Sequence, residues 1–166
     1  VFFKQMTHHL PGLSREFMGK MANVLLIRDP YELLLSYTKV VEAPVMADIG
    51  MADQYELGQE LKVLGCLTAV IDARELLKNP EYVLRLLCEQ LGITFDSAML
   101  SWPAGPKPYD GSWAPYWYSG VHQSTGFKPY QKREGTLNPI AQKLYEEARP
   151  FYEALKTEAL KAQPIT

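Results

Sequence analysis

Three short apolar runs, each followed by a segment of helical character, constrain the fold of this chain most strongly. They cover residues 1–3, 24–27 and 68–71. Strands that alternate with helix-length segments are typical of parallel strands joined by helical crossovers. The pattern therefore predicts an α/β fold in three layers, with helices on both faces of a parallel sheet.

Proline marks the starts of three of the four predicted helices. In each case an Asn or Asp that can cap a helix stands before the proline, which suits the first helical position. The fourth helix is predicted over residues 53–64 without such a pair. The three pairs are Asp29–Pro30, Asn79–Pro80 and Asn138–Pro139.

Other residues predict how these helices continue and end. Glu32 has the spacing of a capping box with Asp29, and the helix that they begin should run to about Val41. The helix that begins at Asn79 and Pro80 should stop at Gly92, because glycine readily adopts the left-handed conformation that follows a helix. Pro150 should kink the helix that begins at Asn138 and Pro139, or divide it in two.

Length and composition set further limits. The 166 residues are enough for one domain, and a net charge of −2 without a basic tail predicts no binding to nucleic acid or to a membrane surface. No apolar run approaches the ~18 residues that span a bilayer. Cys66 and Cys88 are too few for a disulfide framework, so we expect buried thiols in a reducing, cytoplasmic compartment. The sequence gives no signal of the oligomeric state.

Residues 102–130 differ from the rest of the chain. They contain all three tryptophans and show neither helical nor strand periodicity. Long segments of this kind inside a compact domain are usually functional or disordered, and the aromatic content argues against disorder. We expect an ordered loop that either walls a ligand pocket or covers the core.

Arg28 and Ser36 are candidate anion ligands. Arg28 follows a predicted strand, and in parallel α/β folds ligands bind at the carboxyl ends of the strands. Ser36 lies about two turns into the following helix and has a hydroxyl that can donate to the same anion. The alternative is structural: Arg28 pairs with a carboxylate such as Asp72, and Ser36 packs against a strand.

Lys4, His8 and His9 form a second candidate group. A histidine near neutral pKa can act as a general base, and a nearby lysine can stabilise developing negative charge. Adjacent histidines point in different directions, and only His122 remains as a further imidazole, so we expect no metal site. The alternative is that these histidines are structural or surface residues.

Three stretches of the chain, taken in order, resemble one family. They are "KQMTHHLP", "LLIRDPYELLLSY" and "AVIDARELLKNPEYVLRLLCEQLGI", and "LSWPAGPKPYDGSWAPYWYSGVHQSTGF" extends the likeness. Together they are similar to the bacterial and plant branch of the sulfotransferases that use 3′-phosphoadenosine 5′-phosphosulfate (PAPS). The resemblance covers most of residues 1–160. It implies a P-loop NTPase-like sulfotransferase fold and transfer of a sulfuryl group from PAPS to a hydroxyl or amine of a small-molecule acceptor.

The resemblance also implies roles for single residues. In the family an Arg after a strand and a Ser eight residues later hold the 3′-phosphate of PAPS, and Arg28 and Ser36 match both the pattern and the spacing. The catalytic histidine of the family maps best onto His9, with His8 as the second choice. Lys4 is five residues upstream of His9, where the family has its lysine two residues upstream.

The phosphate loop near the C-terminus of the family has two rival matches. One is the stretch that contains Ser124, Thr125 and Gly126, and the other is "KREG" at residues 132–135. We expect the first of these to bind the cofactor. Arg74 departs from the family by standing where an acidic residue is usual.

The family grips the 5′-phosphosulfate of PAPS with a loop that should lie upstream of Val1. We therefore expect residues 1–166 to be a single but N-terminally truncated sulfotransferase-like domain, which begins with Val in place of Met. Two alternatives to an active sulfotransferase stay open. One is a catalytically inactive module that binds adenosine 3′,5′-bisphosphate or a partner, and the other is a nucleotide kinase-like relative.

Overall fold

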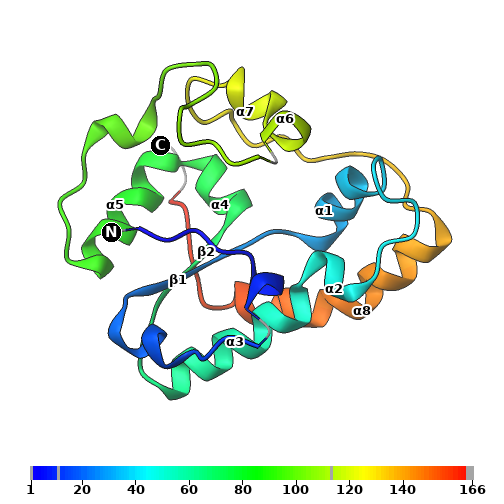
Figure 1. Cartoon of the computed structure of the whole chain (residues 1–166), viewed down its shortest axis with the longest axis horizontal. Coiled ribbons are helices and arrows are strands. Elements are labelled where there is room, and N and C mark those ends of the chain that lie inside the picture. The colour runs from blue at the N-terminus through cyan, green and yellow to red at the C-terminus, as the bar shows by residue number, and fades with distance from the viewer. Residues whose placement is uncertain (1, 11, 113, 164–166) are drawn as a thin grey trace.

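The computed structural model describes residues 2–10, 12–112 and 114–163, apart from the side chains of His8, Tyr116 and Trp117. A small parallel sheet lies at the centre, formed by β1 (Asn23–Ile27), β2 (Leu67–Asp72) and β3 (Ala159–Leu160) in that order. Figure 1 shows α3 (Met51–Val63) and α8 (Pro139–Lys156) on one side of the sheet and α4 (Ala73–Lys78) and α5 (Pro80–Leu91) on the other. The fold is α/β, with a parallel sheet flanked by helices, as predicted.

Two of the three predicted strands are confirmed, as β1 and β2. Residue 1 lies outside the described residues, and the strand prediction is wrong for Phe2 and Phe3, whose exposed fractions are 89% and 63%. A strand requires a neighbour for its backbone hydrogen bonds, and no described strand pairs with these residues. The third strand is β3, which pairs with β2 through only two residues.

Helix α1 (Pro30–Tyr37) begins as predicted and ends four residues early. The Asp29 carboxylate accepts a hydrogen bond of 2.9 Å from the backbone N–H of Tyr31. At the other end the chain turns at Thr38, and the N–H groups of Val40 and Val41 both donate to the carbonyl of Tyr37. These three β-branched residues are poor helix formers, which explains the early end.

Helix α5 (Pro80–Leu91) begins and ends where Asn79, Pro80 and Gly92 predicted. Asn79 caps it by accepting from the N–H of Tyr82 at 3.2 Å, and Gly92 closes it in the left-handed conformation with φ of 64°. A short helix, α4 (Ala73–Lys78), comes directly before it, with the Asp72 carboxylate as its cap. Side-chain caps therefore determine where both helices after β2 begin.

Helix α8 (Pro139–Lys156) is one undivided helix, so of the two effects predicted for Pro150, a kink or a division, the division is wrong. Asn138 caps its start as predicted. Residues on both sides of Pro150 are buried against the sheet and α3, among them Ala148, Tyr152 and Leu155. This packing on both sides keeps the helix continuous, although proline removes one backbone hydrogen bond.

The fourth predicted helix is confirmed, and several short helices complete the chain. The helix expected over 53–64 is α3 (Met51–Val63), preceded by α2 (Met46–Ile49). Within α3, a side chain at Gly58 would meet Leu25 and Leu155 at 3.1 and 3.0 Å, so glycine permits the close packing. The 3₁₀ helices are η1 (Thr7–His9), η2 (Glu16–Lys20) and η3 (Ser97–Leu100).

The aromatic segment over residues 102–130 is irregular except for two short helices, α6 (Ala114–Trp117) and α7 (Ser119–His122). Figure 1 shows it folded above α4 and α5. Among the residues described, no helix has both the length and the apolar character that crossing a membrane requires. The same residues contain no group of three or more His, Cys, Asp and Glu side chains placed to hold a metal ion.

Candidate functional site

Arg28 and Ser36 converge on one backbone group. The Arg28 guanidinium donates to the carbonyl of Glu32 at 3.4 Å, and the Ser36 hydroxyl donates to the same oxygen at 3.5 Å. Arg28 follows the end of β1, and Ser36 lies in the last turn of α1. The helix that starts at Asp29 thus turns the serine back toward the arginine.

The structural alternative paired Arg28 with a carboxylate such as Asp72. Asp72 is instead 1% exposed, and its carboxylate accepts from the hydroxyl of Tyr152 at 2.6 Å and the N–H of Arg74 at 2.7 Å. Both oxygens of Asp72 therefore have partners other than Arg28.

A third residue joins the pair. The guanidinium of Arg133 donates a hydrogen bond to the Ser36 hydroxyl. Arg133 belongs to the "KREG" stretch, whose Gly135 carbonyl accepts from the Tyr31 hydroxyl at 2.9 Å. Of the two rival phosphate loops, "KREG" is therefore the one that the structure places at Ser36. We call Arg28, Ser36 and Arg133 the arginine cluster.

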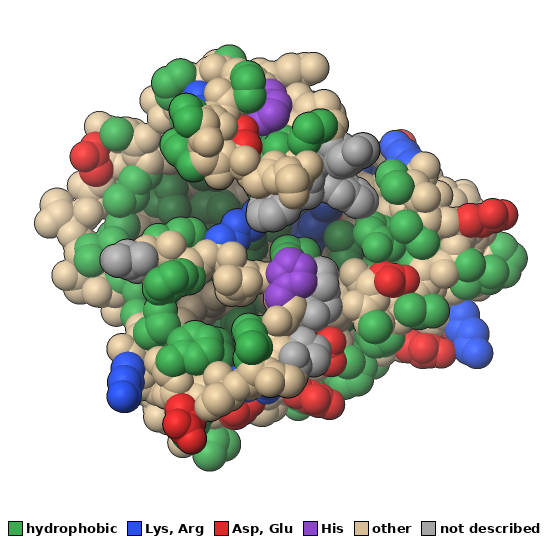
Figure 2. Space-filling model, in the orientation of Figure 1, with side chains coloured by type: hydrophobic (Ala, Val, Ile, Leu, Met, Phe, Trp, Pro, Cys, Tyr) green, Lys and Arg blue, Asp and Glu red, His purple; other side chains and the backbone are tan. Residues whose placement is uncertain are grey.

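The charges of the arginine cluster are unbalanced. Burial lowers the pKa of Arg28, the positive charge of Arg133 lowers it further, and Glu32 and Asp29 offset this only in part. Two guanidinium groups that repel one another beside a serine hydroxyl are a suitable host for an anion with more than one negative charge. Figure 2 shows basic side chains within a hollow on one face of the molecule.

An ion-pair network lies next to the arginine cluster. Arg74 pairs with the carboxylates of Asp29 and Glu32, and its guanidinium lies 5.5 Å from the ring centre of Tyr130. The Tyr130 hydroxyl donates to the Glu32 carboxylate at 2.5 Å. Glu32 therefore points toward Arg74 and Tyr130, and the predicted capping-box role of its side chain is wrong.

The predicted catalytic residues lie on the N-terminal segment, which passes in front of the sheet in Figure 1. His9 ends η1, and its side chain is exposed. The Thr7 hydroxyl ties η1 to the carbonyl of Gly50 at 3.3 Å. The ammonium of Lys4 lies 6.0 Å from the ring centre of Tyr118. The side chain of His8 is outside the described part of the chain.

Ser124, Thr125 and Gly126 contact residues at the start of the aromatic segment. The Ser124 hydroxyl accepts from the indole N–H of Trp102 at 3.0 Å, and the Thr125 carbonyl accepts from the backbone N–H of the same residue at 3.0 Å. Gly126 forms an isolated bridge with Ser101. The predicted site residues thus fall into three groups: the arginine cluster, the N-terminal segment and this aromatic segment.

A paired histidine in the aromatic segment was not predicted. His122 Nε2 lies 2.9 Å from a carboxylate oxygen of Asp110. The backbone N–H of Lys107 and the His122 side chain hold the pKa of Asp110 below its ordinary value. A carboxylate that holds an imidazole fixes its orientation and tautomer. The two residues are twelve positions apart in an irregular segment, so no sequence spacing signals the pair.

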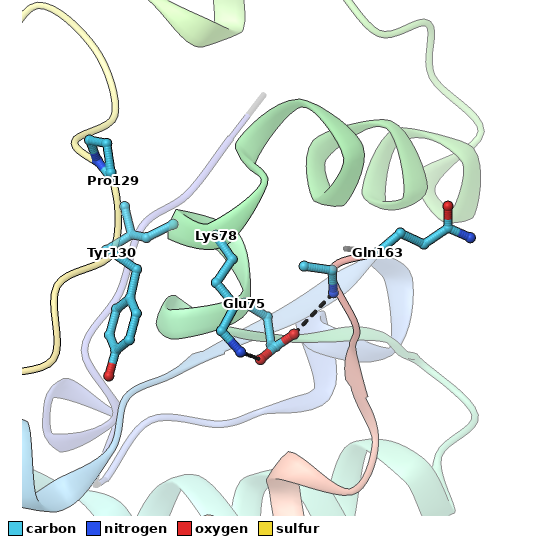
Figure 3. Close-up of a pocket in the computed structure, with 7 residues that line it drawn as sticks. Glu75, Lys78, Pro129, Tyr130 and Gln163 are labelled. Atoms are coloured by element: carbon cyan, nitrogen blue, oxygen red, sulfur yellow. Dashed lines mark hydrogen bonds and ion pairs between the residues drawn. The ribbon is translucent and has the colours of Figure 1, made fainter. Parts of the chain in front are cut away.

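Tyr130 also lines a cavity with a volume of about 470 Å³. Figure 3 shows Glu75 held between the Lys78 ammonium and the backbone of the C-terminal segment. Among the described residues that line it, the two charged side chains, Glu75 and Lys78, are paired with each other. The lining residues are Glu75, Leu77, Lys78, Pro129, Tyr130, Ala162 and Gln163.

Comparisons with known proteins bear on this arrangement. The model of a family described as a sulfotransferase domain matches residues 1–159. The curated relatives include two proteins of Arabidopsis thaliana, branched-chain-amino-acid aminotransferase-like proteins 1 and 2. They are 40% and 39% identical over 88% and 89% of this chain. The chain spans about a quarter of their length, 26% in each case. No solved structure matches.

Proposed function

The chain belongs to the sulfotransferase domain family, and from that premise we propose that it takes part in the transfer of a sulfuryl group from PAPS to a small-molecule hydroxyl or amine. We also propose that its parallel sheet is part of a three-layer, P-loop NTPase-like sulfotransferase fold. The aminotransferase in the names of the relatives is not carried over, because this chain covers only 26% of those proteins.

The arginine cluster is the observation that carries this proposal. Arg28 and Ser36 match the residues that hold the 3′-phosphate in the family, and Arg133 reaches the same serine. A 3′-phosphate has the negative charge that two repelling guanidinium groups require and the oxygens that their N–H groups bind. The residues of this chain therefore fit the nucleotide that the family uses.

In this proposal each residue has a defined task. PAPS supplies a sulfuryl group on a leaving phosphate. The arginine cluster anchors the nucleotide at a distance from the reacting atoms, so that positioning lowers the barrier. The His9 imidazole accepts the proton of the acceptor hydroxyl or amine. The Lys4 ammonium offsets negative charge that develops on the leaving group.

Calorimetry with adenosine 3′,5′-bisphosphate and adenosine 5′-monophosphate tests the binding half of the proposal. The two ligands differ only in the 3′-phosphate, so we expect the bisphosphate to bind more tightly. Arg28→Ala should remove that preference, because a lost charged hydrogen bond costs about 1.5–3 kcal/mol, or roughly 10- to 150-fold in affinity. Equal binding of the two nucleotides, or a preference that survives Arg28→Ala, would overturn the proposal.

The catalytic half needs a separate comparison. His9→Gln should abolish sulfuryl transfer and leave the affinity for adenosine 3′,5′-bisphosphate unchanged. His122→Gln is the matched histidine variant in the aromatic segment. If His122→Gln loses transfer and His9→Gln keeps it, the proton acceptor is His122. Bisphosphate binding without transfer to any acceptor would instead identify the chain as a binding module.

A further inference from the structure

Two tyrosines fasten the segment that carries Arg133 to helix α1. The Tyr130 hydroxyl donates to the Glu32 carboxylate at 2.5 Å, and the Tyr31 hydroxyl donates to the carbonyl of Gly135 at 2.9 Å. Arg133 lies between these two attachments and reaches Ser36. We call residues 130–135 the strap, because both of its ends are bound to the same helix.

Glu32 connects the strap to the arginine cluster. Its backbone carbonyl accepts from Arg28 and Ser36, while its carboxylate accepts from Tyr130 and pairs with Arg74. The residue is only 8% exposed. A buried carboxylate is costly unless it is paired and hydrogen-bonded, so the direction of this side chain depends on Arg74 and Tyr130.

Electrostatic repulsion works against the strap. Arg133 and Arg28 carry like charges close enough for Arg133 to lower the pKa of Arg28. Arg133 itself is exposed, so its own burial does not fix its position. Besides its hydrogen bond to Ser36, the attachment of the strap at Tyr130 and Tyr31 holds it near Arg28.

We infer that Glu32, Arg74 and Tyr130 are positioning residues, which act on the anion only by holding Arg133 against Ser36 and Arg28. This inference rests on the proposed function, since it takes the anion to be a nucleotide phosphate. It assigns a task to Arg74, the residue that departs from the family resemblance. A carboxylate at position 74 would face Asp29 and Glu32 and would release the strap instead of fastening it.

A double-mutant cycle separates positioning from a merely structural role. We expect Tyr130→Phe to weaken binding of adenosine 3′,5′-bisphosphate about fivefold, the typical net value of one hydrogen bond. In an Arg133→Ala background the same substitution should change the affinity less than about twofold, because its target is gone. An equal loss in both backgrounds would overturn the inference.

Proteolysis without ligand tests the strap independently of the proposed function. Trypsin cleaves after Lys132 and Arg133, and cleavage requires the strap to leave α1. Tyr130→Phe should raise the initial rate at these bonds about fivefold, whereas Tyr82→Phe on α5, the matched control, should not. An unchanged rate in Tyr130→Phe would overturn the inference even if the nucleotide binds as proposed.

Two variants of Arg74 test the strap without removing the Tyr130 hydroxyl. Arg74→Lys keeps one charge beside Asp29 and Glu32, so cleavage of the strap should stay within about threefold of the unsubstituted rate. Arg74→Glu should raise the rate more than Tyr130→Phe does. If Tyr130→Phe does not fold, the ratio between these two Arg74 variants decides the question, and equal rates would count against the inference. Should the bisphosphate fail to bind while the strap responds as expected, only the proposed function fails.

Discussion

The guanidinium of Arg133 donates a hydrogen bond to the hydroxyl of Ser36, although 97 positions separate the two residues in the sequence. This contact makes the last turn of α1 and the strap one structural unit at the carboxyl end of β1. Ser36 also donates to the Glu32 carbonyl, which Arg28 shares. The nucleotide phosphate that we propose would therefore bind donors from two distant parts of the chain.

Arg133→Ala removes the most distant of these donors. We expect it to weaken binding of adenosine 3′,5′-bisphosphate by roughly 10- to 150-fold, since a hydrogen bond from a charged group contributes about 1.5–3 kcal/mol. Binding of adenosine 5′-monophosphate should be unaffected. Titration calorimetry with both nucleotides measures the effect.

Lys132→Ala is the control for that experiment. It removes one positive charge from the adjacent position, so it reports how much of the effect is general attraction to an anion. If Lys132→Ala and Arg133→Ala weaken binding equally, the contact between Arg133 and Ser36 has no specific role.

Gly135→Ala tests the fit of the strap against α1. Gly135 has φ of 153°, and a side chain there would lie 3.0 Å from the terminal carbon of Leu35. We expect the strap to shift outward and the affinity for the bisphosphate to fall about threefold to tenfold, with strain of about 1–2 kcal/mol. Gly19→Ala is the control, because a side chain at Gly19 meets no atom within 4 Å. Equal affinities of the two variants would contradict this fit.

The elements that the sequence predicted well are those with local causes. Asn79, Pro80 and Gly92 determine the ends of α5 through contacts within a few residues, so reading the sequence finds them. β3 has only two residues and exists because β2 pairs with it from far along the chain. The N-terminal run failed for the opposite reason, since its apolar residues have no described strand beside them.

The site shows the same division between local and distant contacts. Arg28 and Ser36 lie on one strand–helix unit, so their spacing predicts that they meet. The contact between Arg133 and Ser36 depends on how a loop returns to α1, which spacing does not encode, and the Ser124 hydroxyl contacts Trp102 instead. The Glu32 side chain was misassigned because its partners, Arg74 and Tyr130, are 42 and 98 positions away.

Tyr152→Phe should lower the free energy of unfolding by about 1–3 kcal/mol. Tyr152 is 1% exposed, and its hydroxyl donates to the buried carboxylate of Asp72 at 2.6 Å. The substitution leaves that oxygen without this donor. Urea denaturation measures the loss, and Tyr82→Phe on α5 is the control. Equal stabilities of the two variants would show that Asp72 does not need the tyrosine.

Glu75 predicts a loss of stability on the acid side. Burial alone would raise the pKa of its carboxyl, but hydrogen bonds from Lys78 and the Ala162 N–H outweigh burial and lower the pKa below its ordinary value of 4.5. A pKa that is lower in the folded chain stabilises the fold above that ordinary value, and this stability is lost as the pH falls through the lowered pKa. Glu75→Gln removes the titrating group and should flatten this limb of the curve. Urea denaturation between pH 3 and pH 7 measures this change. Glu81→Gln, at an exposed glutamate that pairs with Arg85, is the control. An acid limb of the same steepness in Glu75→Gln would show that another carboxylate is responsible.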